Sequence, residues 1–411
     1  MRTKLTYTFI VALLLLTPML TYGQAEYDQG KKLYELKCGR CHFAYSPQKY
    51  SVEEWKTIIS DMGPLSGLNQ KSEESIMGYL EQESKGTEKS DLPTNPVLSG
   101  YLYSEFFTAK DITDTFDAHY LNLNINGRLH DRVSYRAEFE LEHGGGSANP
   151  PFVEQAYLDV RLFNNTYVKI GAILTPFNRF DEFHAPLENL LITRPQMSRE
   201  IGVSAWKEVG IDFHGNLFFG QQFYLSYDAY VINGLGDGSR LRSSRHYRDN
   251  NDAKSFGFRL SGVYADIVEV GTSYYTGKWD DEGEMSLSMF GLHFMGTFGD
   301  LNLFGEYSRA TSENPTPLTE GKANGYFIQG SYLLKDKFRP VIRYGTLDYL
   351  DMGNLRGRSP RDKDLKVIAI GFNYYLTKMI VFKIEYDFIL EGDRAESKDN
   401  NLLAFQAAVR F

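Results

Sequence analysis

Hydrophobic and polar residues alternate along most of the chain from about residue 97 onward. Leu121, Leu123 and Ile125 are separated by single asparagines, and the same period of two recurs over 133–142 and 382–388. This period is typical of a β-strand that has one apolar and one polar face. The runs extend over about 10–14 residues, which is longer than an average strand and fits a tilted strand that crosses a bilayer.

The number and spacing of these runs predict a closed barrel. Counted from about Val97, they amount to roughly 16 antiparallel strands whose short and long connections alternate, as periplasmic turns and external loops do in an outer-membrane barrel. The short connections fall near 130–131, 164–165, 220, 265–266, 299–300, 336 and 377–378, and the longer ones near 144–150, 176–206, 234–253, 280–284, 312–321, 351–363 and 391–400. The region is therefore predicted to be an all-β transmembrane barrel, with a large soluble β-domain as the alternative.

The periodicity is helical instead in residues 26–84. A first helix is predicted over 27–36. Ser51-Val52-Glu53-Glu54 is a capping box that opens a second helix, and Gly63-Pro64 ends that helix. A third helix is predicted over about 70–83. Three short helices predict a small all-α domain.

The segments on either side of this helical region predict a leader and a linker. Residues 1–25 are typical of a secretory signal, with Arg2 and Lys4 before an apolar stretch from Phe9 to Leu16. No later run of about 20 apolar residues follows, so no transmembrane helix is predicted. With a mean hydropathy of −0.37, a membrane protein would have to cross with strands. Residues 85–97 are polar and contain two prolines, which predicts a linker.

The strongest chemical motif is Cys38-Gly39-Arg40-Cys41-His42, a C-x-x-C-H sequence. Cys38 and Cys41 are the only cysteines in the sequence. In such a motif the two thiols form thioethers to the vinyl groups of a haem, and the histidine imidazole ligates the iron. A thiol redox pair and half of a zinc site are the alternatives, although zinc needs about four ligands and no second pair exists. The sequence predicts one covalently attached haem c.

The motif and its surrounding helices resemble small monohaem class I cytochrome c domains. The shared pattern is G-x-x-x-Y-x-x-x-C-x-x-C-H from Gly30, then W-x-x-I-I-x-x-M from Trp55, then Y-L. The resemblance implies that Met62 is the second axial ligand of the haem iron, opposite His42. A thioether ligand raises the reduction potential. Met77 as the ligand, or Met62 as an ordinary core residue, are the alternatives.

The composition of the chain excludes some classes of partner and favours others. The formal net charge is −9, and no basic stripe is present, which argues against nucleic acid as a partner. Aromatic residues make up 14% of the chain, a share that fits aromatic girdles at two membrane interfaces. Acidic loop residues either bind a cation or are ordinary solvated charges; they are Asp237, Asp280, Asp281, Glu282 and Glu284.

The barrel region loosely resembles the phosphate-selective porin family from Lys169 to Phe177 and at Arg194-Pro195. The final strand, which ends in Phe411, resembles the assembly signal of bacterial outer-membrane proteins. The longest loop, 176–206, is expected to fold into the lumen as a constriction, by similarity to general porins. Its charged residues are Arg179, Asp181, Glu182, His184, Glu188, Arg194, Arg199 and Glu200. The arginines expected to face the lumen are Arg128, Arg136, Arg161, Arg339 and Arg343.

Together the two regions resemble the fused cytochrome–porins of iron-oxidising bacteria. The expected domains are a signal peptide (1–25), a monohaem cytochrome c domain (26–84), a linker (85–97) and an outer-membrane porin-like barrel (98–411). Because the apolar band of the membrane is insulating, the predicted function is an electron conduit through the outer membrane. It would transfer single electrons between an external donor or acceptor, Fe(II) among the candidates, and periplasmic redox carriers. The haem domain is expected in the periplasm or inside the lumen.

Two other functions stay open. The barrel could be a porin that passes small anions, with the cytochrome tethered in the periplasm. A haem enzyme such as a peroxidase is the weaker alternative, because an iron with a methionine ligand has no open position. The chain is thus interpreted as an electron-transfer protein without catalytic residues, with Fe(II) oxidation as a candidate activity. Its size is compatible with a porin homotrimer.

Overall fold

The computed structural model divides the chain into two compact units, an N-terminal unit and a β-barrel. The structure describes residues 27–38, 47–63, 68–85, 97–110, 113–130, 132–145, 151–163, 165–183, 185–203, 205–220, 222–236, 247–315, 317–318, 320–353, 362–392 and 400–411. The predicted signal peptide lies outside the described residues. No helix in these ranges is both long and apolar enough to span a membrane.

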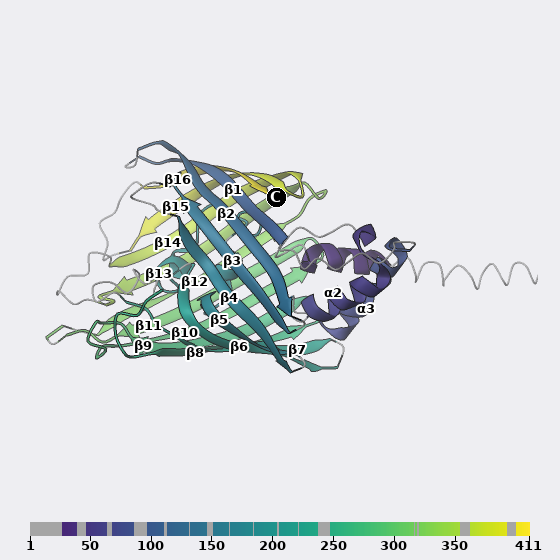
Figure 1. Ribbon diagram of the computed structural model, residues 1–411. Helices are drawn as coiled ribbons and strands as arrows, with labels where there is room; N and C mark the ends of the chain where they lie inside the picture. Colours follow the sequence, from purple (N-terminus) through teal and green to yellow (C-terminus); the bar gives the residue numbers. More distant parts are fainter. Residues whose placement is uncertain are drawn as a thin grey trace, which may run out of the picture. The chain divides into compact units, whose positions relative to one another are not determined.

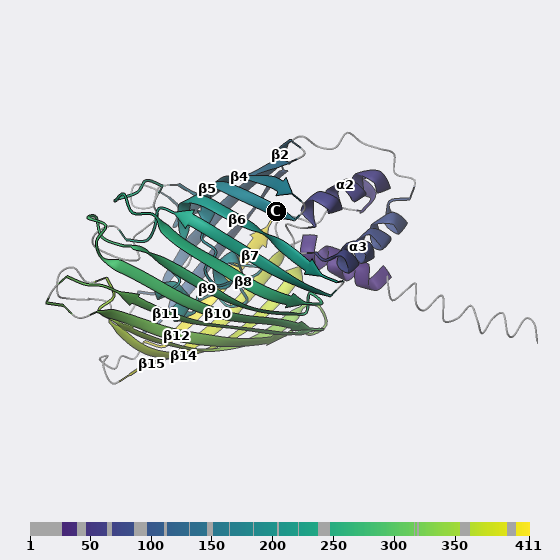
Figure 2. The same cartoon turned by 90° about the horizontal axis from the view of Figure 1, so that it is seen from below.

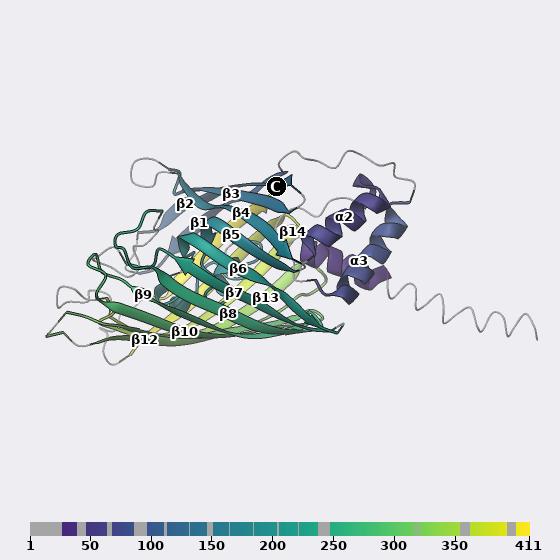
Figure 3. The ribbon, with the colours of Figure 1, turned by 60° about the horizontal axis from the view of Figure 1, so that its bottom comes forward.

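The described part of the N-terminal unit is helical. Residues 27–33 form an α-helix that continues into a π-helical turn, η1 (Tyr34–Cys38). A 3-10 turn, η2 (Pro47–Lys49), precedes α2 (Val52–Met62), and α3 (Gln70–Glu83) packs against α2 (Figure 3). The predicted second and third helices are confirmed, and the first differs by ending in the π turn.

Side-chain caps explain where α2 and α3 begin. Ser51 Oγ accepts the Glu54 N–H at 3.4 Å, and Glu54 Oε2 accepts the Ser51 N–H at 2.8 Å. This is the predicted capping box, which satisfies two backbone donors that a helix start leaves unpaired. Asn69 Oδ1 accepts the Ser72 N–H at 2.8 Å and caps α3 in the same way.

A glycine allows the first helix to lie directly against α3. A Cβ atom on Gly30 would lie 2.1 Å from the Ser75 carbonyl oxygen and 3.0 Å from Tyr79 Cβ, so no larger residue fits. The close approach brings the rings of Tyr27 and Tyr34 to 5.3 and 5.7 Å from the Tyr79 ring. This contact anchors the helix that leads into the C-x-x-C-H motif.

The second unit is a closed barrel in which sixteen antiparallel strands are described (Figure 1). The predicted all-β barrel of about 16 strands is confirmed. The strands are β1 (Val97–Thr108), β2 (Thr115–His130), β3 (Val133–Glu142), β4 (Phe152–Phe163), β5 (Thr166–Leu174), β6 (Lys207–Phe219), β7 (Phe223–Ile232), β8 (Ser255–Tyr264), β9 (Val268–Lys278), β10 (Ser286–Phe298), β11 (Leu301–Ser312), β12 (Gly321–Tyr332), β13 (Phe338–Leu350), β14 (Lys363–Thr377), β15 (Ile380–Glu391) and β16 (Leu402–Arg410).

The first and last strands close the barrel. β1 pairs with β16, so that Tyr101 lies opposite Arg410 and Thr108 opposite Leu403. Gly100 and Phe411 extend this seam, because each accepts the backbone N–H of the other at 3.0 Å. Every strand therefore has two neighbours, and no unpaired strand edge faces lipid.

The alternation of the sequence corresponds to the two faces of the barrel wall. Asn122 and Glu138 are buried and face the lumen, whereas their neighbours Leu121 and Phe139 are exposed on the outer, lipid-facing surface. The predicted connections are confirmed as well. Each even-numbered strand from β2 to β14 is followed by a short turn and each odd-numbered strand from β1 to β15 by a longer loop, so the loops gather at one end of the tilted strands (Figure 2).

A charge on the outer surface of the barrel is expected to destabilise it. Ile370 lies at the middle of β14, between Ile342 and Tyr386 on the neighbouring strands, and is 49% exposed. Ile370→Arg should lower the free energy of unfolding from liposomes by about 2–4 kcal/mol, because an arginine at the bilayer midplane loses its hydration. Ile370→Leu is the control, and equal stability of both variants would mean that this face does not contact lipid.

Candidate functional site

The haem motif begins at the end of the π-helical turn. Cys38 is the last residue of η1, is half-buried, and packs against the apolar cluster of the N-terminal unit. π-Helical turns often occur at functional sites. Cys41 and His42 lie outside the described residues, so their roles as second thioether and iron ligand stay predictions.

The cluster beside Cys38 is aromatic and buried. The Trp55 ring is central, because it meets the rings of Tyr34 and Tyr50 edge-on at 5.7 and 5.0 Å, and its Nε1 donates to the Pro47 carbonyl at 2.7 Å. The buried members are Tyr34, Tyr50, Trp55, Ile59, Leu68, Ile76, Tyr79 and Leu80. An apolar, aromatic surface of this kind next to a cysteine of the motif fits a covalently held porphyrin.

The two candidate methionine ligands have different positions. Met62 is the last residue of α2, and its side chain lies outside the described part of the structure. Met77 lies in α3 and packs against the apolar cluster, which fits a core residue. Burial raises the pKa of Glu73, in the first turn of α3, to about 7, so this unit carries less negative charge at neutral pH than its composition indicates.

The lumen of the barrel is occupied by the loop between β5 and β6. This loop contains η3 (Phe180–Phe183) and α4 (Gln196–Glu200). Its apolar residues share one cluster with inward-facing residues of the wall. The loop contributes Phe177, Phe180, Met197, Ile201, Val203 and Trp206, and the wall contributes among others Tyr230, Tyr275, Phe327 and Tyr349. The expectation that the longest loop folds into the lumen is confirmed.

A buried glutamate of β11 fixes one end of the loop. Glu306 Oε1 accepts the backbone N–H groups of Arg179 and Phe180, both at 2.7 Å. Its other oxygen accepts the Ser198 hydroxyl at 3.3 Å. One wall carboxylate thus joins the start of η3 to α4, which we call the Glu306 clamp.

A second carboxylate, from β15, fixes the middle of the loop. Glu385 accepts the N–H groups of Ile192 and Thr193 and, at 2.6 Å, the Thr193 hydroxyl. Arg343 of β13 donates to the Thr193 carbonyl at 2.9 Å and to its hydroxyl at 2.7 Å. These contacts form the Glu385 clamp. Lys383 adds a bond from its Nζ to the Asn189 carbonyl at 2.6 Å.

Charged groups pair across the remaining lumen. Arg259 of β8 contacts Asp228 of β7 at 2.9 Å and also pairs with Glu182 of the loop. Arg179 of the loop lies 3.0 Å from Glu269 of β9. Anionic groups therefore neutralise these guanidinium groups, and the described lumen shows no unbalanced ladder of cations here.

The sequence pointed to the loop charges and to Arg343 but not to their partners in the wall. Arg179 and Glu182 make contacts within the lumen, whereas His184 lies outside the described residues. Glu306, Glu385 and Arg259 were missed. Their signal is a charged residue at an inward position of an alternating strand, which the sequence shows but does not distinguish from an ordinary wet lumen.

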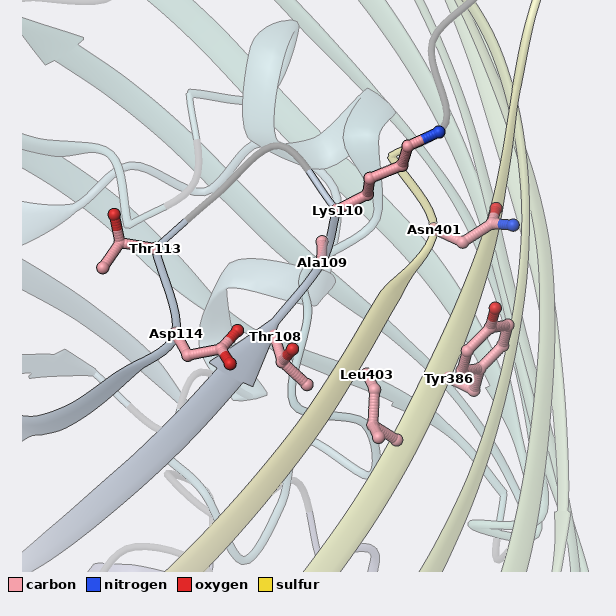
Figure 4. A pocket seen from close by; sticks show the side chains of 8 residues that line it. All are labelled: Thr108, Ala109, Lys110, Thr113, Asp114, Tyr386, Asn401 and Leu403. Atoms are coloured by element: carbon pink, nitrogen blue, oxygen red, sulfur yellow. The ribbon is translucent and has the colours of Figure 1, made fainter.

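One open pocket lies at the loop end of the barrel and is not a luminal site. Thr108, Asp114, Tyr386 and Leu403 contribute to its lining (Figure 4). Thr108 pairs with Leu403, and Leu403 pairs with Tyr386 on the next strand. Tyr386 is exposed on the outer surface, so the pocket is a surface depression without a convergent set of chemical groups.

Comparison with known proteins identifies both parts of the chain. The chain belongs to the Gram-negative porin family, whose model matches residues 97–394. The model of the dihaem cytochrome c family matches residues 34–135. The protein is therefore a cytochrome c fused to a porin, and its place is the bacterial outer membrane.

The individual relatives are distant. An uncharacterised protein of Aquifex aeolicus (strain VF5) is 21% identical over 339 residues, which are 73% of this chain and 76% of the relative. The anion-selective porin from Comamonas acidovorans has a TM-score of 0.58 at 13% identity, with 77% of this chain and 98% of that chain covered. Salmonella typhi OmpF, in complex with daunomycin, has a TM-score of 0.56 at 13% identity, with 77% and 97% covered. These two similarities show a shared barrel fold.

The cytochrome match corrects the prediction of one haem c. The matched family is that of dihaem cytochromes, which points to two haems, so the single-haem prediction is wrong. The sequence contains a single C-x-x-C-H motif, and such a motif marks only a haem that is attached through thioethers. A haem held by side-chain ligands alone leaves no such motif.

Loss of the two clamps is expected to open the lumen. In Glu306→Ala with Glu385→Ala, the backbone N–H groups at residues 179, 180, 192 and 193 lose their acceptors, so the loop should leave the wall. Single-channel conductance in planar bilayers should then rise above that of the unmodified protein. Glu313→Gln is the control, because Glu313 accepts the Ser286 N–H in another loop. Unchanged conductance in the double variant would contradict the clamp assignment.

Proposed function

We propose that this protein carries single electrons across the bacterial outer membrane. The electrons would pass between an external donor or acceptor, with Fe(II) as one candidate, and redox carriers in the periplasm. The observation that carries the proposal is the fusion of a cytochrome c with a porin barrel in one chain. Fusion keeps the redox group at a high local concentration beside the barrel, so two polypeptides need not meet by diffusion.

The haem-binding residues proposed are Cys38 and Cys41 for the thioethers and His42 and Met62 for the iron. Haem iron supplies reversible one-electron chemistry, and its potential depends on the axial ligands. Supporting features in the described part are the half-buried Cys38 at the end of η1 and the aromatic cluster beside it. The proposed fold of this unit is a small all-α class I cytochrome c, and the proposed leader is a secretory signal over residues 1–25.

The loop inside the barrel restricts the lumen for the passage of solutes. The two clamps and the shared apolar cluster hold the loop inside the barrel. An ion that entered this packed region would lose part of its hydration, and Arg179 and Arg259 beside the loop are already paired with carboxylates. A porin for small anions with a tethered cytochrome is the alternative, and the likeness to an anion-selective porin concerns the fold alone. A homotrimer is proposed, because the Vibrio cholerae OmpT structure in its trimer form has the same fold.

Replacing the proposed methionine ligand should change the potential. Met62→His exchanges a thioether for an imidazole, which should lower the reduction potential of the haem attached at Cys38 and Cys41, because sulfur favours the ferrous state. Met77→Leu should leave the potential unchanged. A redox titration of the full chain followed at the haem α-band measures both. A shift in Met77→Leu with none in Met62→His would assign the ligand to Met77.

The conduit itself is tested in sealed liposomes that contain the full chain in one orientation. Membrane-impermeant ferricyanide, or chelated Fe(II), is added on the loop side while the haem α-band is recorded. The proposal expects prompt oxidation by ferricyanide and reduction by Fe(II). A haem that responds only after the vesicles are opened would overturn the conduit. High open-channel conductance of the same preparation would then support the anion porin.

A further inference from the structure

Two histidines and two carboxylates meet at the loop end of the barrel. His119 Nδ1 lies 2.9 Å from Glu105 Oε2 and 3.1 Å from Asp117 Oδ2. His143 Nδ1 lies 2.7 Å from the same Asp117 oxygen. The potential ligand atoms of Asp117, His119 and His143 all lie within 4.8 Å of one another. A single ion could therefore contact all three side chains after small movements.

A β-bulge brings these side chains together. Tyr103 pairs with Tyr120 and Glu105 pairs with Asp117, so one residue of β1 lies opposite two residues of β2. The extra residue shifts the alternation of β2. Asp117 and His119 are partly buried beside Glu105. Phe116, the residue before Asp117 in β2, is 86% exposed on the other face of the strand. Bulges that re-aim a side chain are frequent next to functional sites.

Aromatic rings hold the His119 imidazole in place. The Tyr103 ring stacks on it at 5.3 Å with an interplanar angle of 15°, and the rings of Tyr120 and His143 lie at 4.5 and 4.7 Å. His119 Nδ1 is buried between the carboxylates of Glu105 and Asp117. A metal ion bound at this nitrogen would lie beside both carboxylates.

We infer that Asp117, His119 and His143, with Glu105 as a further carboxylate, form a binding site for a divalent first-row transition metal ion. Imidazole together with carboxylate suits Zn²⁺, Fe²⁺ or Ni²⁺, whereas Mg²⁺ and Ca²⁺ prefer ligand sets made of oxygen alone. Two carboxylates supply negative charge, and one cation, Arg194, interacts with His119. The long loops of outer-membrane barrels face the exterior, so the ion enters from outside the cell. The inference does not depend on electron transfer by the haem domain.

The acidic residues singled out in the sequence do not form such a site in the described structure. Asp280 is buried, and its Oδ1 accepts the N–H groups of Glu284 and Met285 at 3.0 and 2.7 Å, so it holds a tight loop. Asp281 accepts the Asn250 amide at 2.8 Å. Asp237 lies outside the described residues. Asp280 and Asp281 therefore stabilise their loops locally.

Equilibrium dialysis of the purified full chain against Zn²⁺ alone tests the site. The bound metal is counted by atomic absorption, at micromolar zinc and with millimolar Mg²⁺ present. The unmodified protein should bind one Zn²⁺. The substitutions Asp117→Asn, His119→Gln and His143→Gln should each lower the affinity for Zn²⁺ at least about tenfold. Mg²⁺ should not displace it.

The matched control is His214→Gln. His214 Nε2 lies 3.2 Å from Asp159 Oδ1, which is a histidine–carboxylate pair of the same barrel without a second histidine. Zn²⁺ binding should be unchanged in this variant. No zinc bound by the unmodified protein, or equal binding by all four variants, would overturn the inference. Unchanged heat-dependent mobility on gels shows that each variant still forms the barrel.

Discussion

The structure of this protein depends on the complete pairing of backbone hydrogen bonds around the barrel. An unpaired N–H or C=O group in hydrocarbon costs several kcal/mol, so a sheet in a membrane is stable only when it has no edge. β1 and β16 meet this condition, and Gly100 and Phe411 extend their pairing to the last residue. Closure also separates two environments, because every strand then presents alternate residues to lipid and to an enclosed lumen.

Polar groups that are enclosed in the lumen need hydrogen-bond partners there. Glu306 and Glu385 are almost fully buried, and a buried carboxylate is costly unless it accepts hydrogen bonds. The loop between β5 and β6 has the complementary need, since its backbone N–H groups also lie away from water. The carboxylates of the wall therefore accept hydrogen bonds from the backbone N–H groups of the loop. The apolar cluster around Trp206 and Tyr275 packs beside these contacts. The loop and the inward-facing residues of the wall thus form a second apolar core inside the barrel.

The features that could be predicted from the sequence are those that depend on residues close together in the chain. Alternation marked the strands and their connections, and the capping box of Ser51 with the helical spacing after it marked α2, because these features depend on neighbouring residues. The clamps depend on closure instead: Thr193 and Glu385 are 192 positions apart. The bulge at Glu105 and Asp117 was hidden because one extra residue reverses the facing of a strand without leaving a pattern. The second haem to which the dihaem family match points was not predicted, because the sequence has a single C-x-x-C-H motif.

The interiors of the two units are filled in different ways. The N-terminal unit is small, and its helices gather around aromatic rings beside Cys38, a surface that a covalently held porphyrin would complete. The barrel encloses a volume that needs filling, and it uses its own loop. A loop packed inside the lumen restricts the free diffusion of solutes through the barrel. The fusion of a cytochrome c with a barrel whose own loop lies in its lumen is the combination on which the proposed electron transfer is based.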